Sequence, residues 1–289
     1  MNRFTGIWLA LITPFRNGEV DLAAAPKLVS HYLSAGIHGL VVCGTTGESA
    51  TLSSEEQLQW LDAVLDAVGG RCPVVMGVGG NDTAAALRSL PALNARSLAG
   101  LLVTTPYYSR PSQEGIRRHI AAIADATPHD IILYNIPYRT GVNMELATVQ
   151  ALTAHANIVA IKESAGNINQ LMDLIRDTRL QVLSGEDHLV YTTLSLGGQG
   201  TIAAAAHLRP ELFVAMYEAT QRGEWDRARE LSYQLLPMVR TLFTEPNPAV
   251  IKAALAQRGF VTDELRLPML PATQAAREAV DKVLAALQE

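Results

Sequence analysis

The stretch from Ile131 to Ile161, IILYNIPYRTGVNMELATVQALTAHANIVAI, contains one complete copy of the unit that builds this fold. It starts with the apolar run Ile131–Tyr134 and ends with the apolar run Ile158–Ile161. Between them, the segment Leu146–Ala154 has its apolar residues at helical spacing. Because both runs are almost continuously apolar, they are typical of strands that are covered on both faces, as in a parallel sheet. The stretch therefore predicts a strand–helix–strand unit.

The same unit recurs along the chain until about residue 207. Eight apolar runs are predicted as strands, namely Ile7–Ile12, Gly39–Cys43, Val74–Val78, Gly100–Val103, Ile131–Tyr134, Ile158–Ile161, Gln181–Leu183 and Thr201–Ala204. The helical segments between them are Leu22–Leu33, Glu55–Val68, Ala84–Ala95, Glu114–Ala126, Leu146–Ala154 and Ile168–Asp177. This alternation predicts an α/β protein with a (β/α)8 TIM barrel. A doubly wound sheet is the alternative, but it usually has fewer strands and a glycine-rich phosphate loop, which the sequence lacks.

Beyond the last predicted strand the pattern is helical only. The predicted helices are Pro210–Gln221, Glu224–Phe243, Pro248–Arg258 and Ala272–Glu289. Two or three of them exceed what the barrel requires. We therefore predict a catalytic barrel over residues 1–225 and a small C-terminal helical extension over residues 226–289, which either forms a subunit interface or covers the barrel.

Composition excludes several classes of function. The 289 residues are 48% hydrophobic and 18% charged, which indicates a well-packed soluble protein and excludes a disordered one. A net charge of −5 argues against nucleic-acid or membrane-surface binding. The N-terminal run Phe4–Phe15 is short and broken by Pro14, so it indicates a first strand, not a signal peptide, in a cytoplasmic protein. The seven histidines show no metal-binding spacing, and no metal or cofactor is expected.

Lys162 is the first candidate for chemistry. It is one of only four lysines, and it directly follows the strand Ile158–Ile161, whereas the other three lie on predicted helices where a solvated lysine is ordinary. Barrel enzymes carry their active sites at the carboxyl ends of the strands. A buried lysine amine tends to lose its proton and become nucleophilic. The alternative role of Lys162 is a structural salt bridge with an inward-facing carboxylate.

Other polar residues follow neighbouring strands. Tyr134 ends the strand before Lys162 and is expected beside it, either as a proton donor and acceptor or as a core aromatic. The turn Gly44–Gly47 offers amides and two hydroxyls that suit a carboxylate. Arg139 lies five residues after Tyr134 and is either a carboxylate ligand or a solvated loop residue. Glu48 and Glu163 are expected to be structural, since Glu163 should point away from the strand face that holds Lys162.

Together these strand-end motifs resemble the dihydrodipicolinate synthase / N-acetylneuraminate lyase family over essentially the whole chain. The matching motifs are GTTGESATL at Gly44–Leu52, TPYYSRPSQEG at Thr105–Gly115, YNIPYRTG at Tyr134–Gly141, AIKES at Ala160–Ser164 and FTEPNP at Phe243–Pro248. The resemblance implies a class I aldolase-type lyase in which Lys162 forms an imine with pyruvate. Thr45 and Thr46 would bind the pyruvate carboxylate on the loop that starts at Gly44. The resemblance also implies a homodimer or homotetramer.

The remaining roles follow from the same resemblance. Tyr134 and Thr45 would form a proton relay with Tyr108, which in the synthases comes from the neighbouring subunit. Arg139 would hold the carboxylate of the aldehyde substrate, and Ile202 would line the pocket. The paired threonines of the GTTGE motif resemble the synthase branch of the family. That branch joins pyruvate to aspartate 4-semialdehyde in lysine and diaminopimelate biosynthesis.

Some positions differ from the synthase pattern. Lys162–Gly166 reads KESAG where synthases commonly read KEATG, and Ile202–His207 reads IAAAAH where they read ISVTAN. Two alternatives therefore remain, a related aldolase or lyase acting on another 2-oxo acid or sugar-acid aldol, and a non-catalytic paralogue that binds a 2-oxo acid. Three residues match the family's lysine-effector site, and three replace its histidines and glutamate, so weak or absent lysine inhibition is expected. The matching residues are Ser49, Asn81 and Tyr107, and the replacements are Ser54, Gln57 and Ala85.

Overall fold

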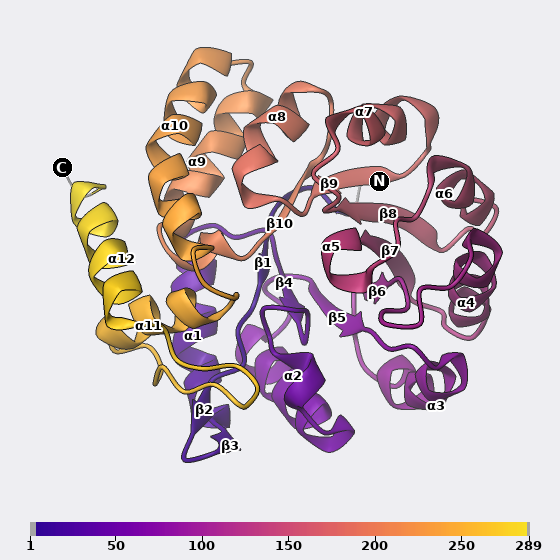
Figure 1. The fold of residues 1–289 in the computed structure, drawn as a ribbon, viewed down its shortest axis with the longest axis horizontal. Helices are drawn as coiled ribbons and strands as arrows, with labels where there is room; N and C mark the ends of the chain where they lie inside the picture. The colour runs from indigo at the N-terminus through magenta and orange to yellow at the C-terminus, as the bar shows by residue number, and fades with distance from the viewer. Residues whose placement is uncertain (1–3, 288–289) are drawn as a thin grey trace. The chain divides into compact units, whose positions relative to one another are not determined.

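The computed structural model describes residues 4–287. Eight parallel strands close into a barrel in the order β1-β10-β9-β8-β7-β6-β5-β4, which confirms the predicted fold class (Figure 1). The strands are β1 (Gly6–Ala10), β4 (Gly39–Val42), β5 (Val74–Val78), β6 (Gly100–Thr104), β7 (Asp130–Asn135), β8 (Ile158–Glu163), β9 (Gln181–Ser184) and β10 (Gly200–Ala203). All eight predicted strands are therefore present, with ends that differ by at most two residues. Every residue of β1, β4 and β10 is buried, as two-sided cover requires.

A short antiparallel hairpin after β1 was not predicted. It pairs β2 (Phe15–Arg16) with β3 (Glu19–Val20). Asn17 and Gly18 join the strands, and both have positive φ angles, 55° and 85°. Asn-Gly is the preferred pair for a two-residue hairpin turn. Strands of two residues are too short to produce an alternating pattern, so the Asn-Gly pair was the only signal for this hairpin.

The helices fall into two compact units. One unit contains Pro73–Ile202 and the described residues before Gly6. Its helices are α3 (Thr83–Asn94), α4 (Gln113–Asp125), α5 (Pro137–Thr140), α6 (Leu146–Leu152), α7 (Ile168–Asp177), η3 (Asp187–Leu189) and α8 (Val190–Ser195). Within this unit α3 packs on α4, α4 on α6, and α6 on α7, so the helices follow the order of their strands (Figure 1). The short helices α5, η3 and α8 were not predicted.

The other unit contains Gly6–Cys72 and the chain from Ala203 onward. Its helices are η1 (Leu22–Ala24), α1 (Ala25–Ser34), η2 (Ser49–Thr51), α2 (Ser54–Val68), η4 (Ala205–His207), α9 (Pro210–Gln221), α10 (Trp225–Leu242), α11 (Ala249–Gln257) and α12 (Gln274–Ala286). The four predicted C-terminal helices are present; the predicted end of the last one, Glu289, lies outside the described residues. Helix α10 packs against α9 and α12. The division into domains at residue 225 stays a prediction.

Candidate active site

Lys162 and Tyr134 lie side by side at the ends of adjacent strands. The register of β7 and β8 pairs Tyr134 directly with Lys162. Lys162 is 6% exposed, and its Nζ lies 4.3 Å from the centroid of the Tyr134 ring. The predicted neighbourhood of these two residues is therefore confirmed. A buried amine next to a phenol has the two groups that imine chemistry needs, a nucleophile and a proton carrier.

The next residue along β8, Glu163, points to the opposite face, as expected from strand alternation. Its carboxylate accepts hydrogen bonds from Asn135 Nδ2 at 3.0 Å, from the Ala165 amide at 2.7 Å and from Gln170 Nε2 at 3.3 Å. Burial raises the pKa of Glu163, and these hydrogen bonds oppose that shift. Because Asn135 ends β7, the network ties the ends of the two strands that carry Tyr134 and Lys162.

Gly185 packs against Lys162 and was missed by the sequence reasoning. It follows β9, and its amide donates to the Glu163 carbonyl at 2.8 Å. A Cβ atom at Gly185 would lie 1.8 Å from Ser164 Oγ and 2.9 Å from Lys162 Cε. No side chain fits between this backbone and the lysine. A glycine directly after a barrel strand was the available signal, because glycine permits close approach of the backbone.

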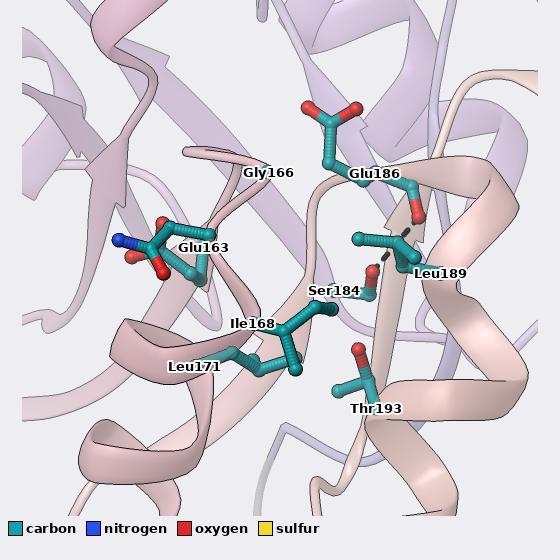
Figure 2. Close-up of a pocket in the computed structure, with 9 residues that line it drawn as sticks. Glu163, Gly166, Ile168, Leu171, Ser184, Glu186, Leu189 and Thr193 are labelled. Carbon is teal, nitrogen blue, oxygen red and sulfur yellow. Dashed lines mark hydrogen bonds between the residues drawn. The ribbon is translucent and has the colours of Figure 1, made fainter.

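Glu186 is a second residue near the lysine that was not predicted. Figure 2 shows its carboxylate directed away from Ser184 and Thr193, with which it lines a small pocket between α7 and α8. Its backbone carbonyl accepts from Ser184 Oγ at 2.9 Å, so Ser184 serves the turn after β9. Burial raises the pKa of Glu186 to about 7, the charge of Asp187 adds to the shift, and the charge of Lys162 opposes it.

Arg139 and Tyr108 are both exposed residues. Arg139 belongs to the short helix α5, and its Nε donates to Tyr138 Oη at 3.1 Å. Tyr108 is 88% exposed and has a φ of 68°, which is unusual for an aromatic residue. The turn around it is closed by the Ser109 amide, which donates to the Tyr107 carbonyl at 2.8 Å. The side chain therefore projects into solvent from this chain.

The second group of candidate residues is in the other compact unit, on the loop Gly44–Glu48, here called the threonine loop. Its amides at Gly47 and Glu48 donate to the carbonyls of Gly44 and Thr45 at 3.1 Å, which forms two overlapping turns. These two amides are therefore used within the loop. A Cβ atom at Gly47 would lie 3.1 Å from the Leu11 carbonyl oxygen, so only glycine fits there without displacement.

Thr46 is buried, and its Oγ1 accepts a hydrogen bond from Asn247 Nδ2 at 2.9 Å. Glu48, the last residue of the threonine loop, forms a buried ion pair with Lys252. The prediction that Glu48 is structural agrees with this pairing. The prediction that Lys252 is an ordinary solvated helix lysine is wrong, because its side chain is fully buried. Helical periodicity could not reveal this, since the partner lies about 200 residues away in the sequence.

The remaining candidates have different surroundings. Ile202 is fully buried in β10, whereas Asn81 is exposed just before α3. Ser49 begins η2, and its carbonyl accepts from Gln57 Nε2 at 3.1 Å. Within residues 4–287 no cluster of histidine, cysteine, aspartate or glutamate is arranged to hold a metal ion. The same part of the chain contains no helix that is both long and apolar enough to cross a membrane.

Known proteins share both the sequence and the fold. The model of the dihydrodipicolinate synthetase family matches residues 3–287. The 4-hydroxy-tetrahydrodipicolinate synthase of Syntrophus aciditrophicus is 41% identical, with 97% of each chain covered. That of Methanocaldococcus jannaschii is 39% identical over 97% of this chain and 98% of its own. The crystal structure of dihydrodipicolinate synthase from Thermotoga maritima has a TM-score of 0.96 and 36% identity over 99% of both chains. A monomeric dihydrodipicolinate synthase variant also has a TM-score of 0.96, at 35% identity over 99% of this chain and 97% of its own.

Proposed function

Because this chain belongs to the dihydrodipicolinate synthetase family, we propose that it is a lyase that condenses pyruvate with aspartate 4-semialdehyde to 4-hydroxy-tetrahydrodipicolinate. This step would serve lysine and diaminopimelate biosynthesis in the cytoplasm. The observation that carries the proposal is the buried amine of Lys162 against the ring of Tyr134 at the strand ends. Relatives that are named for this activity match the chain over nearly its full length.

In the proposed reaction, the Lys162 amine attacks the C2 carbonyl of pyruvate and forms a carbinolamine. Loss of water then gives the imine, and loss of a methyl proton gives the enamine, whose carbon attacks the aldehyde. Tyr134 would carry protons to and from the carbinolamine, together with Thr45. The amino group of the semialdehyde-derived half then attacks the imine carbon and displaces the Lys162 amine. This step closes the ring of 4-hydroxy-tetrahydrodipicolinate and returns the free lysine.

Substrate binding would come from both groups of residues. Thr45 and Thr46 would hold the pyruvate carboxylate on the loop that begins at Gly44, since hydroxyl donors suit a carboxylate. Arg139 would bind the carboxylate of the semialdehyde, and its exposure would let it meet an incoming substrate. Ile202 would supply an apolar wall to the pocket.

We propose that the active form is a homodimer or a dimer of dimers in which Tyr108 acts in the neighbouring subunit. Its 88% exposure means that residues 4–287 of its own chain leave this ring almost uncovered. A mixed dimer of Tyr108→Phe and Lys162→Ala subunits tests the proposal, because one complete site would remain. Partial activity supports the shared site, whereas an inactive mixed dimer contradicts it.

A second candidate function is condensation of pyruvate with a different aldehyde. It is favoured by Ala203, Ala204 and Ala205, which replace the serine, valine and threonine of the synthase pattern and are all buried. The deciding experiment measures pyruvate consumption with aspartate 4-semialdehyde and with a panel of sugar-acid aldehydes. Preferred turnover of the semialdehyde supports the first function. Turnover of another aldehyde alone rejects it and keeps the imine chemistry, whereas no turnover with any aldehyde supports a binding protein.

A further inference from the structure

We propose that Asn247 and Lys252, from the C-terminal helical region, are positioning residues that set the threonine loop for carboxylate binding. Asn247 would orient the hydroxyl of Thr46, and Lys252 would fix the backbone through Glu48. The inference rests on the proposed function, because it takes the bound carboxylate to be that of pyruvate. It also gives the C-terminal helices a role in the active site.

The hydrogen bond between Asn247 and Thr46 has a direction that matters for binding. Asn247 Nδ2 donates to Thr46 Oγ1 at 2.9 Å, so the threonine oxygen accepts this bond. The hydroxyl has one proton of its own, which therefore remains available for another acceptor. An anion such as a carboxylate is the strongest acceptor for that proton. Asn247 would thus make Thr46 a donor toward the substrate.

Lys252 holds the other end of the loop. Its ammonium group is fully buried, pairs with Glu48 and donates to the Glu264 carbonyl at 2.9 Å. It also lies 4.1 Å from the centroid of the Phe15 ring. Burial lowers the pKa of Lys252 and raises the pKa of Glu48, and each charge opposes the shift of the other. Removing one partner would leave a buried charge without compensation, which is strongly destabilising.

Glu48 needs such an anchor because its backbone is strained. It has a φ of 51°, in the left-handed region that disfavours residues other than glycine. Its amide closes the turn on the Thr45 carbonyl at 3.1 Å, so the conformation of Glu48 is linked to that of Thr45. Displacing the Glu48 side chain would therefore move the backbone that joins Thr45 and Thr46 to the following helix η2.

Both positioning residues come from one short segment, and a third contact supports them. Asn247 and Lys252 flank the start of α11, where the chain passes from the loop into the helix. Farther along, Arg266 Nη1 donates to the Thr51 carbonyl at 2.9 Å, and its guanidinium pairs with Glu56 of α2. The yellow chain segment between α11 and α12 approaches α2 in Figure 1. The C-terminal region therefore contacts the threonine loop and the turn after it at three places.

The first experiment reverses the hydrogen bond at Thr46. Pyruvate is trapped on Lys162 with borohydride over a range of pyruvate concentrations, and the half-saturating concentration is measured for Asn247→Asp and Asn247→Ala. An aspartate would accept the Thr46 proton and repel a carboxylate, so Asn247→Asp should raise this concentration by about tenfold or more. Asn247→Ala should raise it less. The control is Asn94→Asp, because Asn94 also binds a threonine hydroxyl, that of Thr127 at 2.7 Å.

An unchanged half-saturating concentration in Asn247→Asp would overturn the orienting role of Asn247. An equal rise in the Asn94→Asp control would overturn it too, because the effect would then be one of general stability. Failure of the unaltered protein to trap pyruvate would refute the proposed function itself, which is a distinct outcome.

The second experiment separates positioning from folding. Lys252→Met removes one charge, and the double variant Lys252→Met, Glu48→Gln removes both while keeping similar volumes. The single variant should raise the half-saturating pyruvate concentration by about tenfold, and the double variant should return this concentration most of the way to that of the unaltered protein. Lys27→Met is the control, because Lys27 Nζ also donates to a backbone carbonyl, that of Gly259 at 2.6 Å.

Thermal unfolding of each variant accompanies these measurements. Should Lys252→Met fail to fold, the double variant decides the question, since it buries no unpaired charge. The proposal is supported if the double variant folds and binds pyruvate as well as the unaltered protein. A folded Lys252→Met variant with unchanged pyruvate binding, or a folded double variant that binds pyruvate poorly, overturns the role of the ion pair.

Discussion

Replacing Gly185 with alanine tests whether the lysine amine depends on the backbone packed against it. The added Cβ would lie 1.8 Å from Ser164 Oγ and 2.9 Å from Lys162 Cε, whereas ordinary contact begins at 3.4 Å. Ser164 Oγ would have to withdraw by about 1.6 Å and Lys162 Cε by about 0.5 Å, the differences between these distances. Ser164 is almost fully buried, so it has little room to give way.

Two effects of Gly185→Ala follow. Overpacking of this kind costs roughly 1–3 kcal/mol of folding free energy. Displacing a reacting group by a large fraction of an ångström lowers its rate by about 10- to 100-fold. Chemical denaturation measures the first effect, and the rate of pyruvate trapping at saturating pyruvate measures the second.

The double variant Gly185→Ala, Ser164→Ala separates the two effects. It removes the nearer clash, with Ser164 Oγ, and leaves the contact with Lys162 Cε. Stability should therefore recover while the trapping rate stays low, and Ser164→Ala alone serves as the control for losing the hydroxyl. A Gly185→Ala protein with an unchanged trapping rate would refute the reasoning, because the reactivity of Lys162 would then not depend on the packing of Gly185 against it.

Three further predictions concern pH and regulation. Burial lowers the pKa of His207 to about 4, so the unfolded chain binds the proton first as the pH falls. In the folded chain the neutral ring accepts a hydrogen bond from the Ile12 amide at 3.1 Å. Folding stability should therefore fall by up to about 3 kcal/mol between pH 6.5 and pH 4, and His207→Gln should abolish this slope in urea unfolding. Because the pKa of Glu186 is about 7, its carboxylate becomes charged as the pH rises through 7. This charge near the cationic imine should speed the trapping of pyruvate, and an unchanged pH profile in Glu186→Gln would contradict this. Free lysine should inhibit weakly, because Ala85 has no carboxylate to bind the amino group of the lysine, and such a charge-assisted hydrogen bond contributes roughly 1.5–3 kcal/mol. Half-inhibition at sub-millimolar lysine would contradict that expectation.

The barrel could be predicted from the sequence because most of its strands are nearly continuous apolar runs between helical segments. The run Ile158–Ile161 indicated β8, and alternation along it correctly placed Lys162 and Glu163 on opposite faces. The hairpin around Asn17 and the short helix α5 gave no periodic signal, because elements of two to four residues are shorter than the period that would reveal them.

The site was predictable where it depends on strand neighbours, and less so where it depends on distant contacts. Tyr134 and Lys162 lie near the ends of consecutive strands, so their pairing could be inferred from order alone. Gly185 has no side chain to suggest a role, and its importance is visible only as the space that it leaves open. Lys252 looked like a solvated lysine because its partner, Glu48, is far away in the sequence.

Trapping of pyruvate is the most direct test of the central claim, that Lys162 forms the imine. The protein is incubated with pyruvate and borohydride, digested, and analysed by mass spectrometry to locate the reduced adduct. We predict a single adduct on Lys162 and none in Lys162→Ala. The buried Lys252, which pairs with Glu48, should remain unmodified. The absence of any adduct, or an unchanged adduct in Lys162→Ala, would contradict the account.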